Sequence, residues 1–150
     1  MNLLLMRHGD AVMSYPDADR PLSLLGATEV MANGASLLEA NVKVSHIIAS
    51  PLSRAQETAG LMATRLGYHD AILSWDSLSP AGDIGQVLAL LATSDFENPL
   101  LVTHQPFVSE FIDYLTSEVV MMGTASIVAI TLDVFLPQAS ELKWSIDTCG

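Results

Sequence analysis

Residues 3–9 read Leu3-Leu4-Leu5-Met6-Arg7-His8-Gly9. A short apolar run that is followed at once by charged residues is typical of a buried strand that ends at a polar site. Glycine has no Cβ, so the backbone at Gly9 could approach a bound ligand closely. We therefore expect a buried first strand that delivers Arg7, His8 and Gly9 to one edge of a sheet.

The alternation of strands and helices continues along the chain. Apolar runs predict further strands at residues 46–49, 71–74 and 100–103, and a closing pair at 126–132 and 142–146. Apolar residues at helical spacing predict helices over residues 24–38, 52–66, 84–91 and 108–115. This order predicts an α/β fold, a three-layer α/β/α sandwich with a mostly parallel central sheet. Nothing in the sequence suggests a linker, so we expect residues 1–150 to form a single domain.

Capping residues mark several of these helix ends. Ser23 precedes the first helix, and Ser50 followed by Pro51 has the form of an N-cap with proline at the first helical position. Gly67 follows the second helix, where a glycine commonly ends a helix. We expect these residues to set the boundaries of the two helices.

The charge balance excludes two classes of partner. Asp and Glu number 17 against 6 for Lys and Arg, which leaves a formal net charge of −11. Nucleic acids and anionic membrane surfaces are bound by clustered basic residues, so we expect neither as a partner. Cys149 is the only cysteine, which excludes an internal disulfide and favours a reducing compartment such as the cytoplasm.

Polar residues follow three of the predicted strands. Arg7 and His8 follow the first strand, Arg54 comes soon after the second, and His104 follows the strand at 100–103. Ligands of such sheets bind outside the carboxyl ends of the strands, so we expect these four side chains to converge there. Arginine matches phosphate oxygens, and neighbouring cations disfavour protonation of a histidine. The pattern predicts a phosphoryl pocket with a neutral, nucleophilic histidine and no metal cofactor.

Three motifs resemble those of a known family. They are Met6-Arg7-His8-Gly9-Asp10-Ala11, Ser50-Pro51-Leu52-Ser53-Arg54-Ala55 and Val102-Thr103-His104. In this order and spacing they are similar to motifs of the histidine phosphatase (phosphoglycerate mutase-like) superfamily. The stretches Arg20-Pro21-Leu22 and residues 78–83 are most similar to its small phosphohistidine phosphatases. The resemblance implies that His8 is the nucleophile, that Arg7, Arg54 and His104 hold the phosphoryl group, and that Arg20 is a further arginine of the substrate pocket.

The resemblance also implies a substrate class. Members that cleave phosphate esters usually carry a carboxylic acid, and in mutases it comes with a large insertion. Only 49 residues separate Arg54 from His104 here, and Asp83 is a poor candidate for that acid. Phosphohistidine, once its ring is protonated, releases neutral imidazole, and solvent can supply that proton. We therefore expect a monomeric phosphatase that acts on a histidine phosphotransfer (HPt) domain in a phosphorelay.

Other interpretations of the same residues stay open. A small-molecule phosphomonoesterase of the same superfamily and a non-catalytic adaptor that binds phosphohistidine would both use this pocket. A metal-binding protein is disfavoured because the four histidines lack ligand spacing. Arg20 could pair with Asp17 or Asp19 instead of binding substrate. We expect structural roles for His46 and His69, and turn or capping roles for Asp10 and Asp83.

Overall fold

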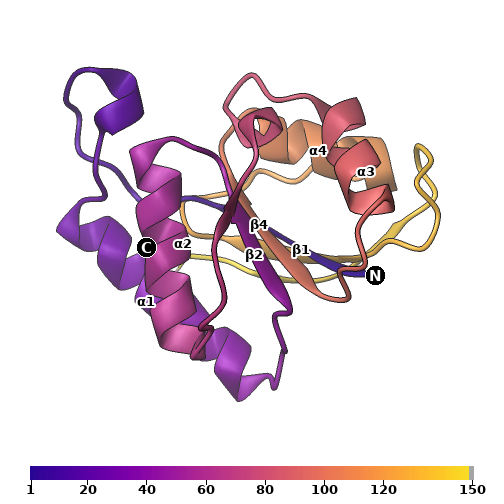
Figure 1. The fold of residues 1–150 in the computed structure, drawn as a ribbon, viewed down its shortest axis with the longest axis horizontal. Helices are drawn as coiled ribbons and strands as arrows, with labels where there is room; N and C mark the ends of the chain where they lie inside the picture. Colours follow the sequence, from indigo (N-terminus) through magenta and orange to yellow (C-terminus); the bar gives the residue numbers. More distant parts are fainter. Residues whose placement is uncertain (149–150) are drawn as a thin grey trace.

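The computed structural model describes residues 1–148, and Cys149 lies outside them. Its centre is a sheet with strand order β3-β2-β4-β1-β5-β6 (Figure 1). The strands are β1 (Asn2–Arg7), β2 (His46–Ala49), β3 (Leu73–Ser74), β4 (Pro99–Thr103), β5 (Ile127–Thr131) and β6 (Glu141–Ile146). The first four strands run parallel, and β5 runs antiparallel to both β1 and β6. The mostly parallel sheet and its closing antiparallel pair confirm the prediction.

Helices cover both faces of this sheet (Figure 1). One face carries α1 (Leu24–Glu39) and α2 (Ser53–Leu66), and the other carries α3 (Ile84–Ala92) and α4 (Phe107–Thr116). Two short 3-10 helices, η1 (Asp17–Asp19) and η2 (Asp76–Leu78), interrupt the connections. The three-layer α/β/α arrangement is as expected, without a large insertion. None of the helices within residues 1–148 is long and apolar enough to cross a membrane.

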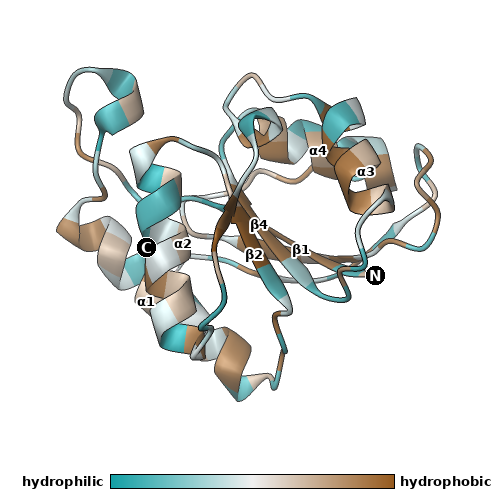
Figure 2. Cartoon of the chain, viewed as in Figure 1, coloured by the Kyte–Doolittle hydropathy of each residue, from teal (hydrophilic) through white to brown (hydrophobic). Residues whose placement is uncertain are grey.

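The strand β1 is buried on both of its faces. Leu3 and Leu5 pack in the core beneath α3 and α4, whereas Leu4 and Met6 pack in the core beneath α1 and α2. Successive side chains of a strand point to opposite faces, so a strand covered on both sides needs an unbroken apolar run. The hydrophobic colouring of the central strands in Figure 2 shows the same pattern. This burial holds the polar end of β1 in a defined place.

The helix ends agree with the sequence at two positions and differ at a third. Ser23 accepts a hydrogen bond from the Gly26 backbone N–H at 3.0 Å, and Gly67 ends α2 with a φ of 68°. The prediction that Ser50 caps α2 is wrong, because α2 begins at Ser53 with Leu52 as N-cap. The backbone N–H of Ser50 donates to the Val102 carbonyl at 3.0 Å. Ser50 therefore continues the pairing of β2 with β4 and cannot begin the helix.

Two glycines allow α1 to pack directly on the loop after β1. A Cβ at Gly9 would lie 2.7 Å from the Gly26 carbonyl oxygen, and a Cβ at Gly26 would overlap the backbone of Asp10. Backbone atoms cannot move aside as a flexible side chain can. The close approach of α1 therefore fixes the loop that follows His8.

We predict opposite effects for alanine at two helical glycines. Gly26→Ala should lower the free energy of unfolding by about 2 kcal/mol, because overpacking against backbone strains the structure. At Gly60, in the middle of α2, an added Cβ meets no heavy atom within 4 Å. Gly60→Ala should therefore raise the free energy of unfolding by about 0.5–1 kcal/mol through helix propensity. Urea unfolding followed by circular dichroism measures both, and equal effects would contradict the packing described here.

Candidate active site

The register of three neighbouring parallel strands brings the polar residues together. Arg7 on β1 is paired with Thr103 on β4, and Val102 on β4 is paired with Ala49 on β2. The residues that follow these strands, His8, His104 and Ser50, therefore lie side by side at one edge of the sheet. The rings of His8 and His104 have centroids 4.9 Å apart. The predicted convergence of distant segments is present in the structure.

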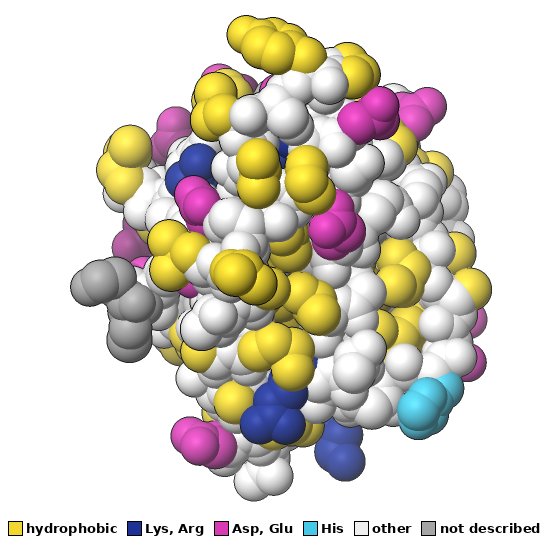
Figure 3. Space-filling model, turned by 90° about the vertical axis from the view of Figure 1, so that its left-hand side faces the viewer, with side chains coloured by type: hydrophobic (Ala, Val, Ile, Leu, Met, Phe, Trp, Pro, Cys, Tyr) yellow, Lys and Arg dark blue, Asp and Glu magenta, His cyan; other side chains and the backbone are white. Residues whose placement is uncertain are grey.

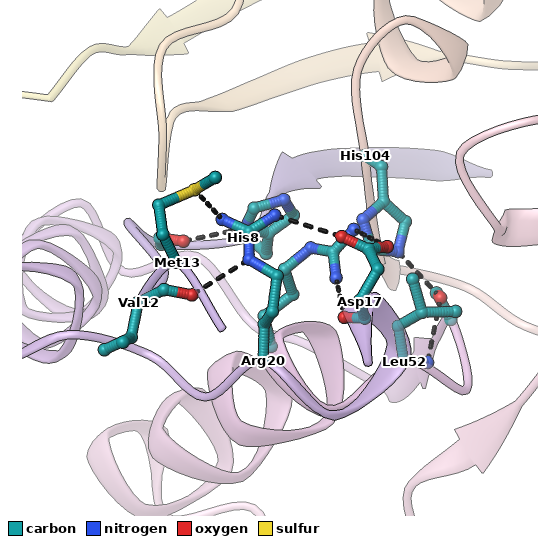
Figure 4. A network of polar contacts seen from close by, with 10 residues as sticks. His8, Val12, Met13, Asp17, Arg20, Leu52 and His104 are labelled. Carbon is teal, nitrogen blue, oxygen red and sulfur yellow. Dashed lines mark hydrogen bonds and ion pairs between the residues drawn. The ribbon is translucent and has the colours of Figure 1, made fainter. Parts of the chain in front are cut away.

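A pocket of about 440 Å³ opens at this edge. Its lining includes five of the predicted residues, Arg7, His8, Arg20, Arg54 and His104 (Figure 4 shows His8, Arg20 and His104). Gly9 is not part of the lining. Its missing Cβ makes room for α1, and contact between the Gly9 backbone and a substrate stays a prediction.

His8 is buried and held in one orientation. Its Nδ1 lies 2.7 Å from the Gly9 carbonyl oxygen, and only 8% of the residue is exposed. A carbonyl oxygen can only accept a hydrogen bond, so Nδ1 carries the proton of the neutral ring. The lone pair is then on Nε2, which is the nitrogen available to attack a bound substrate.

Both pocket histidines are neutral at pH 7. Burial lowers the pKa of His8 to about 4, the nearby Arg54, Arg7 and Arg20 lower it further, and the hydrogen bond to Gly9 opposes the change. Burial also lowers the pKa of His104 to about 3, with added repulsion from His8 and Arg54. Burial, and not the neighbouring arginines that the sequence indicates, is therefore the larger cause of the neutral state.

Ser50 determines which nitrogen of His104 faces a ligand. The Ser50 hydroxyl oxygen lies 2.7 Å from His104 Nε2 and accepts a hydrogen bond from the Leu52 backbone N–H at 3.2 Å. The Ser50 hydroxyl can donate its own proton to Nε2, and in that tautomer the ring proton of neutral His104 is on Nδ1. This buried Nδ1 has no hydrogen-bond partner among residues 1–148. It is a donor suited to an anionic oxygen.

The arginines come from three separate segments and are tied to the main chain. Arg7 Nη1 donates to the Met122 carbonyl at 3.0 Å, and Arg54 Nη1 donates to the Asp17 carbonyl at 2.9 Å. Arg20 pairs with Asp17 Oδ1 at 3.2 Å, which confirms the predicted pairing, and it also lines the pocket, where its binding of substrate stays a prediction. The buried Nε atoms of Arg7 and Arg54 have no partner among the described residues. Such donors match the oxygens of a phosphoryl group.

Sequence reasoning missed two residues that hold the site loop in place. Thr58 on α2 accepts a hydrogen bond from the Gly9 backbone N–H at 3.1 Å. Glu29 on α1 accepts one from the Asp10 backbone N–H and another from the Thr124 hydroxyl, both at 3.0 Å. Each residue lies within an amphipathic helix, where nothing in the local sequence distinguishes it from an ordinary surface residue.

Asp83 and His46 have structural roles, as expected, whereas Asp10 makes a structural contact and also lines the pocket. Asp10 accepts a hydrogen bond from the Ser23 hydroxyl at 2.6 Å, and Asp83 caps α3 by accepting from the Gln86 backbone N–H at 3.0 Å. His46 stacks on Phe96 with ring centroids 4.0 Å apart. His69 is exposed and lies outside the pocket.

Among residues 1–148, no group of three or more His, Cys, Asp or Glu side chains is placed to hold a metal ion. The positive charge of the pocket comes from arginine side chains.

Comparisons with known proteins agree with this geometry. Residues 3–79 match the model of the histidine phosphatase superfamily (branch 1). Phosphohistidine phosphatase SixA of Escherichia coli (strain K12) is 30% identical over 162 aligned positions, which cover 100% of this chain and 96% of that protein.

Solved structures extend the similarity to the fold. The structure of the protein histidine phosphatase SixA complexed with tungstate matches with a TM-score of 0.91 and 27% identity, over 99% of this chain and 98% of that one. A mycobacterial glucosyl-3-phosphoglycerate phosphatase complexed with VO3 shares the fold, with a TM-score of 0.74 and 18% identity over 95% and 96% of the two chains.

We predict that acid destabilises the fold through the two pocket histidines. The pKa of a histidine in the unfolded chain is about 6.5. In the folded protein the pKa is about 4 for His8 and about 3 for His104. The unfolded state therefore binds more protons between these values, and the free energy of unfolding falls as the pH falls from about 7 to about 4. Urea unfolding at both pH values measures the decrease.

A double variant separates the histidine contribution from that of other groups. His8→Ala with His104→Ala should show a smaller decrease between the two pH values than the unaltered protein. His69→Ala is the control, because this exposed histidine should leave the decrease unchanged. An equal decrease in the double variant would contradict the burial effect.

Proposed function

The chain belongs to the histidine phosphatase superfamily and is a phosphatase, and from this premise we propose that it hydrolyses phosphohistidine in a protein. The observation that carries the proposal is the buried, neutral His8, whose Nδ1–H is held by the Gly9 carbonyl beside three arginines. We propose His8, Arg7, Arg54 and His104 as the catalytic residues, Arg20 as a substrate-binding residue, and residues 1–150 as one catalytic domain.

In the first step, Nε2 of His8 attacks phosphorus in line with the bond to the leaving group. Arg7, Arg54 and Nδ1–H of His104 bind the oxygens of the phosphoryl group, and their charge stabilises the transition state. The Gly9 carbonyl keeps its hydrogen bond to Nδ1 as the ring becomes positively charged. The product is a phosphorylated His8 and a free histidine on the substrate.

In the second step, water attacks the phosphorus of the phosphorylated His8. The bond between phosphorus and Nε2 breaks, its electron pair returns to Nε2, and the neutral ring with its proton on Nδ1 is restored. Inorganic phosphate leaves with the oxygen and the protons of the water. Because Nδ1 is already protonated, the enzyme histidine is itself a good leaving group. These steps need no metal ion or cofactor, since positioned arginines supply the positive charge.

The carboxylates of the pocket favour phosphohistidine over phosphate esters. An ester needs a proton donor for its leaving oxygen. Asp10 already accepts a hydrogen bond from Ser23. The pKa of Asp17 is lowered, and its hydrogen bond from Arg20 is the largest cause. The Asp17 carboxylate is therefore not suited to give up a proton at pH 7. Protonated phosphohistidine has no such need, because it releases a neutral ring.

The surface beside the pocket supports a protein substrate. Hydrophobic side chains gather on the face formed by α1, α2 and the segment that precedes α1 (Figure 3). Met13, which also lines the pocket, is 84% exposed, and Tyr15 and Leu24 are more exposed still. Exposed apolar surface of this kind is typical of interaction sites. We propose an HPt domain of a two-component phosphorelay as the partner. We also propose that the enzyme binds it as a monomer in the cytoplasm.

Replacement of His8 tests the mechanism. His8→Ala should abolish release of phosphate from a ³²P-labelled HPt domain and should remove acid-labile ³²P labelling of the enzyme. His69→Ala, with an exposed histidine outside the pocket, should retain both. Full turnover in His8→Ala would show that the phosphoryl group does not pass through this residue.

The same experiment distinguishes the alternative functions. The fold is shared with a glucosyl-3-phosphoglycerate phosphatase, so a panel of alkyl phosphates is compared with the labelled HPt domain. Higher kcat/KM on the esters would favour a small-molecule phosphomonoesterase. Binding of the phosphorylated domain without turnover would favour an adaptor.

We predict that the guanidinium of Arg54 cannot be replaced by an amine. Arg54→Lys should lower kcat/KM about a hundredfold, because the single amine loses the forked contacts that bind two oxygens at once. Arg65→Lys, an exposed position on the same helix, is the control and should change kcat/KM less than twofold. Equal values for the two variants would exclude Arg54 from phosphoryl binding.

A further inference from the structure

Asp17 is an ionised carboxylate on the rim of the pocket. Its Oδ1 lies 3.2 Å from Arg20 Nη1 and its Oδ2 lies 3.2 Å from Arg54 Nη2. The Arg54 side chain is 6% exposed, whereas the Asp17 side chain is 63% exposed. Figure 4 shows Asp17 beside Arg20 on the side of His104. Asp17 therefore lies at the open mouth of the pocket, and the arginines that it contacts are more buried than Asp17.

The direction of attack places the leaving group at this mouth. In phosphoryl transfer the attacking and leaving atoms lie roughly in line on opposite sides of phosphorus. His8 is buried at the base of the site, and a protein substrate can approach only from solvent. The departing imidazole ring is consequently on the solvent side of the phosphoryl group, where Asp17 lies.

From this geometry we propose that the Asp17 carboxylate accepts a hydrogen bond from the protonated leaving imidazole and so selects phosphohistidine over phosphate esters. The inference rests on the proposed function. A carboxylate offers about four acceptor positions. The hydrogen bonds from Arg20 and Arg54 use two of them, so Asp17 can hold its arginine partners and still accept from a substrate ring.

The bonds and charges of the step balance with this contact. The Nε2 lone pair of His8 forms the new bond to phosphorus, and the bond between phosphorus and the substrate ring breaks. The electron pair of that bond stays on the ring nitrogen. The ring, already protonated on its other nitrogen by solvent, leaves as neutral imidazole with that proton still donated to Asp17. The Gly9 carbonyl accepts the corresponding hydrogen bond from Nδ1–H of His8. The enzyme ring and the substrate ring therefore each donate to one acceptor.

An ionised carboxylate has the opposite effect on an ester. The leaving oxygen of an ester becomes negative as its bond to phosphorus breaks, and a nearby carboxylate repels that charge. Paired with two arginines, Asp17 also has no proton to donate. One residue therefore assists one leaving group and disfavours the other.

Asp17→Asn tests this role because it keeps the shape and removes the charge. We expect kcat/KM on a phosphorylated HPt domain to fall about tenfold, because the neutral amide oxygen is a weaker acceptor than the carboxylate. On phenyl phosphate it should stay unchanged or rise. Asp19→Asn, exposed in the same turn, is the matched control and should change neither value.

Other outcomes would overturn the proposal. If Asp17 only aligned the arginines, both substrates would lose activity by the same factor, and the affinity for inorganic phosphate measured by calorimetry would fall. If Asp17 only blocked the pocket, both activities would rise. Unchanged activity on both substrates would likewise exclude the contact.

The test separates this inference from the proposed function. Failure of the unaltered enzyme to hydrolyse the phosphorylated domain, with good turnover of phenyl phosphate, would overturn both. A normal preference for the domain in the unaltered enzyme, followed by a parallel loss in Asp17→Asn, would overturn only the role of Asp17. Circular dichroism and the thermal midpoint of each variant show that it is folded.

Discussion

The parallel pairing of β2, β4 and β1 is the constraint on which the site depends. Because Arg7 is opposite Thr103 and Ala49 is opposite Val102, three strands end at the same level of the sheet. His8, Ser50 and His104 follow these ends and cannot separate without breaking the pairing. The hydrogen bond from the His8 backbone N–H to the Thr103 carbonyl, at 3.0 Å, continues the pairing into the site itself.

Burial then gives this group of residues its chemistry. The chain carries a formal net charge of −11, yet its pocket is lined by three of its four arginines. Removal of His8 and His104 from water lowers their pKa values, so both rings stay neutral beside those cations. The backbone carbonyl of Gly9 places the proton of His8 on Nδ1, and the hydroxyl of Ser50 contacts Nε2 of His104, so that Nδ1 faces the pocket. Two identical side chains thus have different surroundings, which suit the roles proposed for them, a nucleophile and a donor.

The carboxylates complete this division of roles. Asp10 and Glu29 accept hydrogen bonds from α1 and from the site loop, and so maintain the shape of the pocket. Asp17 is different because both of its oxygens face arginines at the solvent side. An acidic residue at that place would ordinarily weaken phosphate binding, and its presence is understandable if it acts on the leaving group.

The sequence alone determined the fold class, the order of the strands along the chain and four of the catalytic candidates, because buried strands need apolar runs and phosphoryl chemistry needs arginine and histidine. It also indicated Arg20, but could not decide between substrate binding and pairing with Asp17. Only the tertiary structure showed that Gly9 makes room for α1, that Ser50 orients His104, and that Thr58 and Glu29 hold the site loop. These roles depend on contacts between residues far apart in the chain. Spacing along the sequence does not indicate which distant backbone group or hydroxyl will contact a given histidine ring.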